Sequence, residues 1–149
     1  MALADDLPGA AIFKETVTIE VTEPAVGRLR EAAAVAADTA TQLLADPWRT
    51  PGVRPEADRD EARAHAQRAI DRARFVHDQF RAGASRVTVS LPLEVLTGLV
   101  RVALEREEHE LALALDPASV RDRSIALVAL ISLRTELEDM TAATYISDR

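Results

Sequence analysis

Two short stretches of the chain alternate between apolar and polar residues, which is the period of a half-buried β-strand. In residues 16–21 the apolar positions are Val17, Ile19 and Val21, and residues 86–91 repeat the alternation. We therefore predict two strands. Because two short strands are not stable alone in water, we expect them to pair antiparallel about a pseudo-two-fold axis, with their apolar faces on helices.

Four longer stretches follow the 3.6-residue period of helices. Pro24 and Pro92 stand near the first turns of two of them, where a missing N–H and a fixed φ cost little. Asp-Pro pairs at residues 46–47 and 116–117 can cap and start the next helix. Residues 110–116 alternate like a strand, but they continue a helical pattern and we keep them helical. The predicted helices cover residues 24–45, 58–81, 92–115 and 117–140.

The second and fourth predicted helices have different apolar faces. The second has a narrow, coiled-coil-like seam, with alternating spacings of four and three residues: Ala62, Ala66, Ala69, Ala73, Val76 and Phe80. Gly83 follows this helix, where a left-handed C-cap is expected. The fourth helix is apolar nearly all round from residue 125 to residue 133. It is therefore either central in the fold or covered on one side by another chain.

The two strand-and-helix units resemble each other at an offset of 70 residues. The identities at this offset include the two Asp-Pro pairs and the pairs Leu29 and Leu99, Ala33 and Ala103, and Leu43 and Leu113. We therefore predict a mainly α (α+β) fold, in which a tandem duplicated β-α-α unit forms a four-helix core with a short two-stranded antiparallel ribbon.

The length of 149 residues fits one domain, residues 1–149. Within it we expect a flexible leader at residues 1–14, repeat 1 at 15–83, repeat 2 at 84–142 and a tail at 143–149. Residues 48–55 have no counterpart in the second repeat. This insertion holds the only tryptophan, Trp48.

The composition narrows the chemistry and the compartment. The chain is 48% hydrophobic but only 3% aromatic and has no cysteine, so its core must consist of Leu, Val, Ile and Ala, without disulfides or thiolate sites. Its first residues lack a signal-peptide pattern, and no apolar run reaches the roughly 20 residues that span a bilayer. We expect a cytoplasmic protein with no membrane contact.

Charge separates along the chain although its net charge is −7. Residues 49–86 hold nine arginines and six acidic residues, whereas the remainder is strongly acidic. The plain interpretation is a solvated helix whose arginines pair with nearby acids; the alternative is a docking face for an acidic partner, including a second copy. The candidate partner-binding residues on this face and in the insertion are Trp48, Arg59, Arg63, Arg74, Phe75 and Arg81.

The sequence contains no recognisable catalytic, metal or cofactor motif. His65, His77 and His109 lack the spacings of a carboxylate-bridged metal bundle or of a zincin. The five glycines are too scattered for a phosphate-cradling loop, and no Ser-His-acid pattern occurs. We interpret the acidic run around His109, residues 105–110, as solvated surface. The alternatives are a pH-sensitive contact and a metal site on the face that Glu105, Glu108 and His109 could share. We expect no catalysis, cofactor, metal or small-molecule ligand.

The segment from Arg86 to Leu96, Arg-Val-Thr-Val-Ser-Leu-Pro-Leu-Glu-Val-Leu, resembles the opening of ribbon-helix-helix proteins. The resemblance implies a DNA-binding regulator built as a fused pseudo-dimer. Its base-reading residues would be Arg86, Thr88 and Ser90, with Thr18 and Glu20. Because duplex binding draws on cationic contacts and this chain is acidic, we favour another function. We predict a non-catalytic protein-binding or self-assembling regulatory module, with a protein partner or homo-oligomer rather than nucleic acid.

Overall fold

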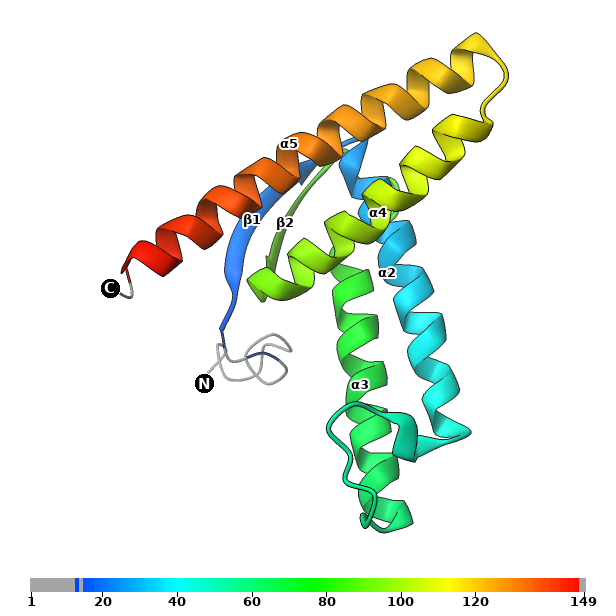
Figure 1. Cartoon of the computed structure of the whole chain (residues 1–149), viewed down its shortest axis with the longest axis vertical. Coiled ribbons are helices and arrows are strands. Elements are labelled where there is room, and N and C mark those ends of the chain that lie inside the picture. Colours follow the sequence, from blue (N-terminus) through cyan, green and yellow to red (C-terminus); the bar gives the residue numbers. More distant parts are fainter. Residues whose placement is uncertain (1–12, 14, 148–149) are drawn as a thin grey trace.

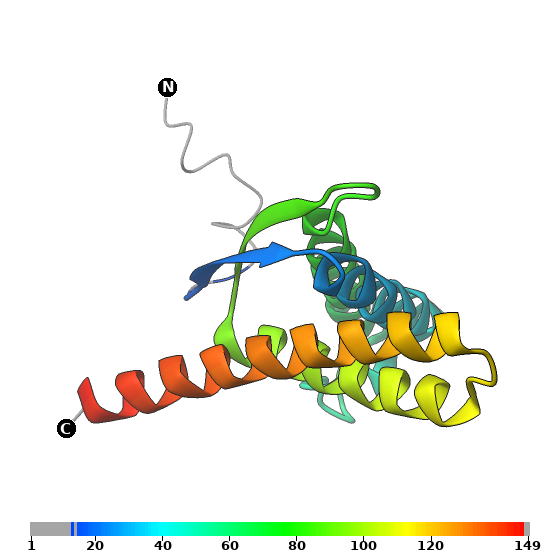
Figure 2. The same cartoon turned by 90° about the horizontal axis from the view of Figure 1, so that it is seen from above.

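The computed structural model describes residue 13 and residues 15–147 (Figure 1, Figure 2). Two short 3-10 turns, η1 (Gln42–Leu44) and η2 (Pro47–Arg49), join the first two helices. The predicted leader, residues 1–14, lies outside the described residues apart from Phe13. The main elements are β1 (Val17–Thr22), α2 (Ala25–Thr41), α3 (Arg59–Gln79), β2 (Arg86–Leu91), α4 (Leu93–Leu113) and α5 (Pro117–Ser147).

The two strands form an antiparallel ribbon with one apolar face and one polar face. The register places Val17 opposite Leu91 and Ile19 opposite Val89. The polar residues between the apolar ones point away from the core. Both predicted strands and their antiparallel pairing are thus confirmed, with β1 shifted by one residue. The apolar side chains that the ribbon buries are Ile19, Val21, Val87, Val89 and Leu91.

Aspartate side chains fix the starts of two helices. Asp58 Oδ1 accepts a hydrogen bond from the backbone N–H of Glu61 (2.7 Å) and caps α3. Asp116 Oδ2 accepts one from the backbone N–H of Ser119 (2.9 Å) and caps α5, as the Asp-Pro pattern predicts. Asp46, the other predicted cap, makes no side-chain cap bond, and only the short turn η2 follows it.

The helix ends differ in part from the predictions. Gly83 has a left-handed φ of +75°, but it lies in the turn before β2, three residues beyond the C-cap Phe80. Its predicted place as the cap of α3 is therefore wrong. Arg30 Nη1 instead donates a hydrogen bond to the Phe80 carbonyl (2.5 Å). α4 ends at Leu113, two residues earlier than predicted, because Ala114 is extended. α5 continues beyond its predicted end at residue 140.

The helices form two antiparallel hairpins, α2–α3 and α4–α5, which meet at the ribbon and point in different directions (Figure 1). The main apolar core lies where the hairpins and the ribbon meet, and all four helices contribute to it. Away from that core, α3 closes on α2 through Ala62, Ala66 and Ile70, which are buried. The predicted seam lacks Ile70. The largest fully buried side chains of the core include Leu29, Phe80, Leu91, Leu96, Leu130 and Leu137.

A buried ion cluster joins the two hairpins. Glu107 of α4 is only 2% exposed, and its Oε1 lies 2.5 Å from Arg28 Nε of α2 and 3.1 Å from Arg123 Nη1 of α5. Because an unpaired buried carboxylate is strongly unfavourable, the two arginines hold α2 and α5 against α4. The interpretation of residues 105–110 as solvated surface is therefore wrong at Glu107.

Candidate functional site

The outer side of α5 is an exposed apolar helix face. The exposed fractions are 39% for Val120, 53% for Ile125, 63% for Val128 and 38% for Ile131. At 100° per residue, these four positions fall within one sector of about 140°. The opposite side of the same helix is buried in the fold through Ala126, Leu130, Leu133 and Leu137. α5 is therefore apolar on two sides, of which only one is covered.

The position of α5 decides between the two alternatives that its sequence leaves open. The helix lies at the outside of the molecule, packed along α4 on one side (Figure 2). A central position is therefore wrong for this helix. Cover by another chain stays a prediction, and it is the alternative that accounts for an apolar residue as exposed as Val128.

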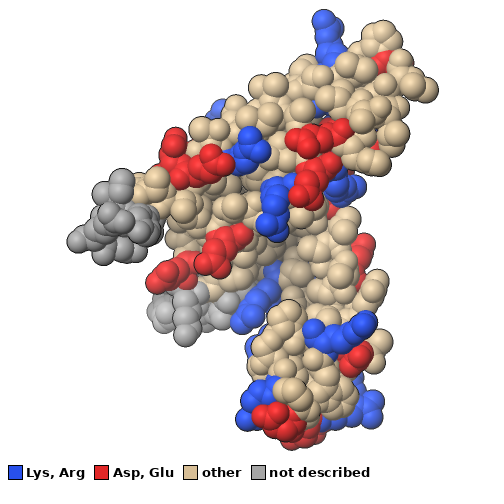
Figure 3. All heavy atoms as spheres, viewed as in Figure 1, with Lys and Arg blue, Asp and Glu red and all other residues tan. Residues whose placement is uncertain are grey.

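The apolar surface continues at the tip of the α4–α5 hairpin. Leu113, at the end of α4, is 62% exposed, and Leu115, in the connection to α5, is 97% exposed. Figure 3 shows few charged side chains at this tip, whereas both signs of charge gather at the tip of the α2–α3 hairpin. Exposed apolar surface gathered on one element marks a contact site more often than isolated apolar residues do.

The arginines of the predicted docking face on α3 are exposed but do not form one cluster. Arg59 and Arg63 lie in the first turns of α3, whereas Arg74 lies near its other end and Arg81 lies two residues beyond the helix, not on it as predicted. Arg59 and Arg74 are about 22 Å apart along the helix axis at 1.5 Å per residue. Trp48, which is 43% exposed, donates from Nε1 to a backbone carbonyl just before α3 (2.9 Å). The predicted residues therefore divide into two groups.

Phe75 belongs to the second of these groups and is half-buried. Its ring centroid lies 6.0 Å from that of Phe13, and its side chain packs on the main core. Phe75 and Arg81 also line a surface hollow of about 610 Å³ together with Arg86 and Thr88 of β2. The structure thus brings two of the six predicted residues together beside the ribbon. A change at Phe75 would disturb packing as well as any contact made there.

The polar face of the ribbon carries the residues to which the ribbon-helix-helix resemblance assigns base reading. Thr18 and Ser90 share a hydrogen bond between their hydroxyl groups (2.8 Å). Glu20 Oε1 forms an ion pair with Arg86 Nε (3.2 Å), so the cation of this set is paired with its anion. Outside the ribbon, the Gln79 side chain bonds both backbone groups of Ser90 and covers the free edge of β2 there.

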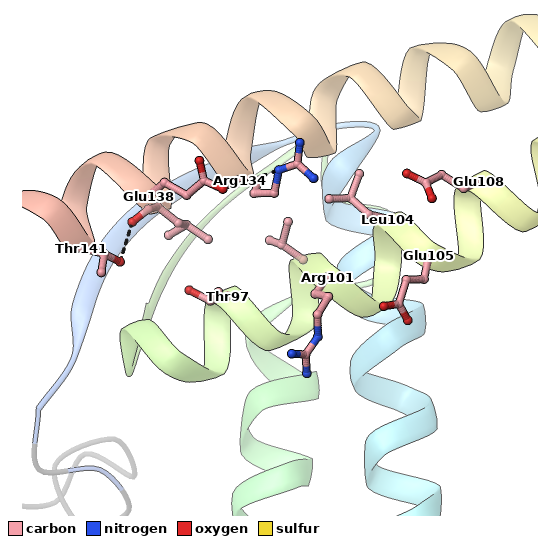
Figure 4. A pocket seen from close by; sticks show the side chains of 10 residues that line it. Thr97, Arg101, Leu104, Glu105, Glu108, Arg134, Glu138 and Thr141 are labelled. Carbon is pink, nitrogen blue, oxygen red and sulfur yellow. Dashed lines mark hydrogen bonds and ion pairs between the residues drawn. The ribbon is translucent and has the colours of Figure 1, made fainter.

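The groove between α4 and α5 contains charged residues that point in different directions (Figure 4). Its volume is about 340 Å³. Arg101 and Glu105 point away from α5, whereas Arg134 and Glu138 form an ion pair along α5 (3.8 Å). An active site needs polar groups that converge on one reacting position, and these four residues do not form such a group.

Comparison with known proteins identifies no relative for this chain. No family model, no curated protein and no solved structure matches it. Among the described residues, no three histidine, cysteine or acidic side chains gather so that they could hold a metal ion. None of the described helices combines the length and apolarity needed to cross a membrane.

The outer face of α5 is absent from the predicted set of partner-binding residues. The sequence signal for it is the apolar run at residues 125–133, which predicts that α5 is covered on more than one side. The run does not specify which side packs on the fold. Only the structure separates Leu130, which is fully buried, from Val128, which is mostly exposed.

Proposed function

We propose that this protein is a non-catalytic protein-binding or self-assembling regulatory module that binds through the outer face of α5. The observation that carries the proposal is a helix on the outside of the molecule with a second apolar side. Complete burial of one large aliphatic side chain stabilises by about 1.5–3 kcal/mol. Four partly exposed side chains on one face therefore supply several kcal/mol to a contact. The cytoplasmic location stays a prediction from the sequence.

We also propose that the two β-α-α units are copies of one ancestral unit. If a two-fold axis relates two copies, the residue at the centre of their strand pair lies opposite its own counterpart. At an offset of 70 residues the counterpart of Ile19 is Val89, and these two residues pair in the ribbon. The order strand, helix, helix also occurs twice along the chain.

A photoreactive amino acid at Val128 of the full chain, expressed in the cells that make it, tests the docking face. A matched control carries the same group at Glu31, an exposed position of α2 outside every predicted contact. We expect light-dependent adducts from position 128, with a second copy or another protein, and none from position 31. Equal labelling from both positions, or none from position 128, would overturn the proposal. Adducts from the same photoreactive group at position 63, with none from position 128, would favour the docking face on α3.

One observation favours a second function, a ribbon-helix-helix-like DNA-binding regulator built as a fused pseudo-dimer. The polar face of the ribbon is uncovered, with Thr18 and Thr88 exposed. The ion pair between Glu20 and Arg86 weighs against it, because it places an anion where phosphate would approach. Duplex binding that falls steeply with salt and is lost in Arg86→Ala would support this function. No binding at low salt would exclude it.

A further inference from the structure

We infer that the occupant of the outer face of α5 is the same face of a second copy, with the two helices antiparallel about a two-fold axis near residue 130. This inference rests on the proposed function and adds the partner and the orientation. A two-fold contact requires a face that complements itself, so that each residue meets its own symmetry-related set. Charge and side-chain size along α5 both satisfy that requirement.

Two charged residues near the ends of this face, Arg121 and Asp139, complement each other only in the antiparallel orientation. Arg121 and Asp139 are 18 residues apart, which is five complete turns, so they lie at the same angle near opposite ends of the exposed face. Both are exposed, and neither forms an ion pair within the described residues. An antiparallel pair brings each Arg121 to the second copy's Asp139. A parallel pair brings like charges together.

Side-chain sizes fit the same orientation. With the axis near residue 130, Val128 meets Ser132 of the second copy and Ile125 meets its Thr135. These residues share the exposed sector of the helix with Ser124. Val128 and Ile125 therefore each face a smaller side chain, which allows the ridges of one helix to enter the grooves of the other at the centre of the contact. At a crossing angle of about 20°, long side chains such as Arg121 still reach across the contact.

Two charge-reversed variants test both the partner and the orientation: Arg121→Asp and Asp139→Arg. Each variant alone places like charges opposite each other twice in the dimer. An equimolar mixture restores two attractive pairs in every heterodimer. We expect the unchanged chain to sediment as a dimer and each variant alone to dimerise roughly tenfold or more weakly. The mixture should return to within about threefold of the unchanged chain. Circular dichroism of each variant checks that its fold is intact.

The possible failures separate this inference from the proposed function. If the unchanged chain is a monomer at every concentration, the second copy is not the occupant, and adducts from Val128 to another protein would still support the proposed function. If Val128→Glu dissociates the dimer but the mixture does not recover, the face self-associates in another orientation and the inference is overturned. If Val128→Glu leaves the dimer intact, the dimer uses another surface and both proposals lose their support.

Discussion

The two hairpins of this protein solve the same packing problem with different residues. The α2–α3 hairpin closes on small side chains of α3, among them Ala62 and Ala66, and presents arginine and acidic residues to solvent, together with single apolar residues such as Val35. The α4–α5 hairpin buries large aliphatic residues such as Leu130 and still leaves Val128 and Leu115 exposed. A narrow seam suffices to close a pair of helices. We interpret the exposed apolar residues of α5 as a contact surface because they gather on one face of one helix.

The largest expected effect on stability comes from shortening a side chain on the buried side of α5. Leu130→Ala removes a side chain that is fully buried in the core and should lower the free energy of unfolding by about 2–5 kcal/mol. Its matched control is Val128→Ala, two residues away on the exposed side, which should change the stability of the monomer by less than about 0.5 kcal/mol. Urea denaturation at a protein concentration that keeps the chain monomeric measures both. Similar losses at both positions would contradict the assignment of the two sides.

The α2–α3 hairpin should be destabilised by the opposite change, a larger side chain in the seam between its helices. Ala66 has no exposed surface, and a longer side chain there must push α3 away from α2. Ala66→Leu is expected to lower the free energy of unfolding by about 1–3 kcal/mol. The control is Ala64→Leu on the exposed side of α3, which should be nearly neutral. An Ala66→Leu variant as stable as the unchanged chain in thermal denaturation would mean that the seam is not closely packed.

Glu107 tests the joint between the two hairpins. Glu107→Gln removes the negative charge that Arg28 and Arg123 share but keeps the shape of the side chain. Because the two arginines keep 24% and 32% of their side-chain surface exposed, water can solvate them in part. We expect a loss of about 1–3 kcal/mol. Glu108→Gln, on the exposed side of α4, is the control. If both changes lower the free energy of unfolding by the same small amount, the contact between the two hairpins does not depend on this ion cluster.

The smallest expected effect is at the cap of α5. Hydrogen bonds from Ser119, side chain first and then backbone, hold the pKa of Asp116 below its ordinary value of 3.8. A lowered pKa in the folded state means that this contribution to stability is complete above pH 3.8 and is lost as the pH falls through the folded-state pKa. Asp116→Asn should therefore lose this part of the acid dependence of the melting temperature. An unchanged dependence in the variant would contradict the role of the Asp116 carboxylate.

The sequence predicts most of the strands and helix starts because interactions between neighbouring residues determine them. The alternation of Val87 and Val89 predicts β2 with its bounds, and Asp116 predicts the start of α5. The seam of α3 is less exact. The buried residues Ala62, Ala66 and Ile70 keep a spacing of four, whereas the predicted spacing of three after Ala66 leads to Ala69, which is only partly covered.

Long-range placement explains what the sequence did not predict. Glu107 lies seven residues after Val100 and four after Ala103, so it continues the buried stripe of α4; that spacing is a signal which the acidic run around it obscured. The outer position of α5 depends on the angle between the two hairpins, which no local pattern encodes. The predicted set around Arg63 and Phe75 consequently emphasises charge on α3 rather than the exposed apolar side of α5.

The most direct test of the outer face of α5 as a contact surface is the solution mass at low and high salt, measured by light scattering on the unchanged chain and on Val128→Glu. The expected result is a dimer that persists in high salt and becomes a monomer in Val128→Glu, because its contact is mainly apolar. Arg63→Glu is the control and should remain a dimer. A dimer that dissociates in salt and is lost in Arg63→Glu, but not in Val128→Glu, would contradict the assignment and place the contact on α3.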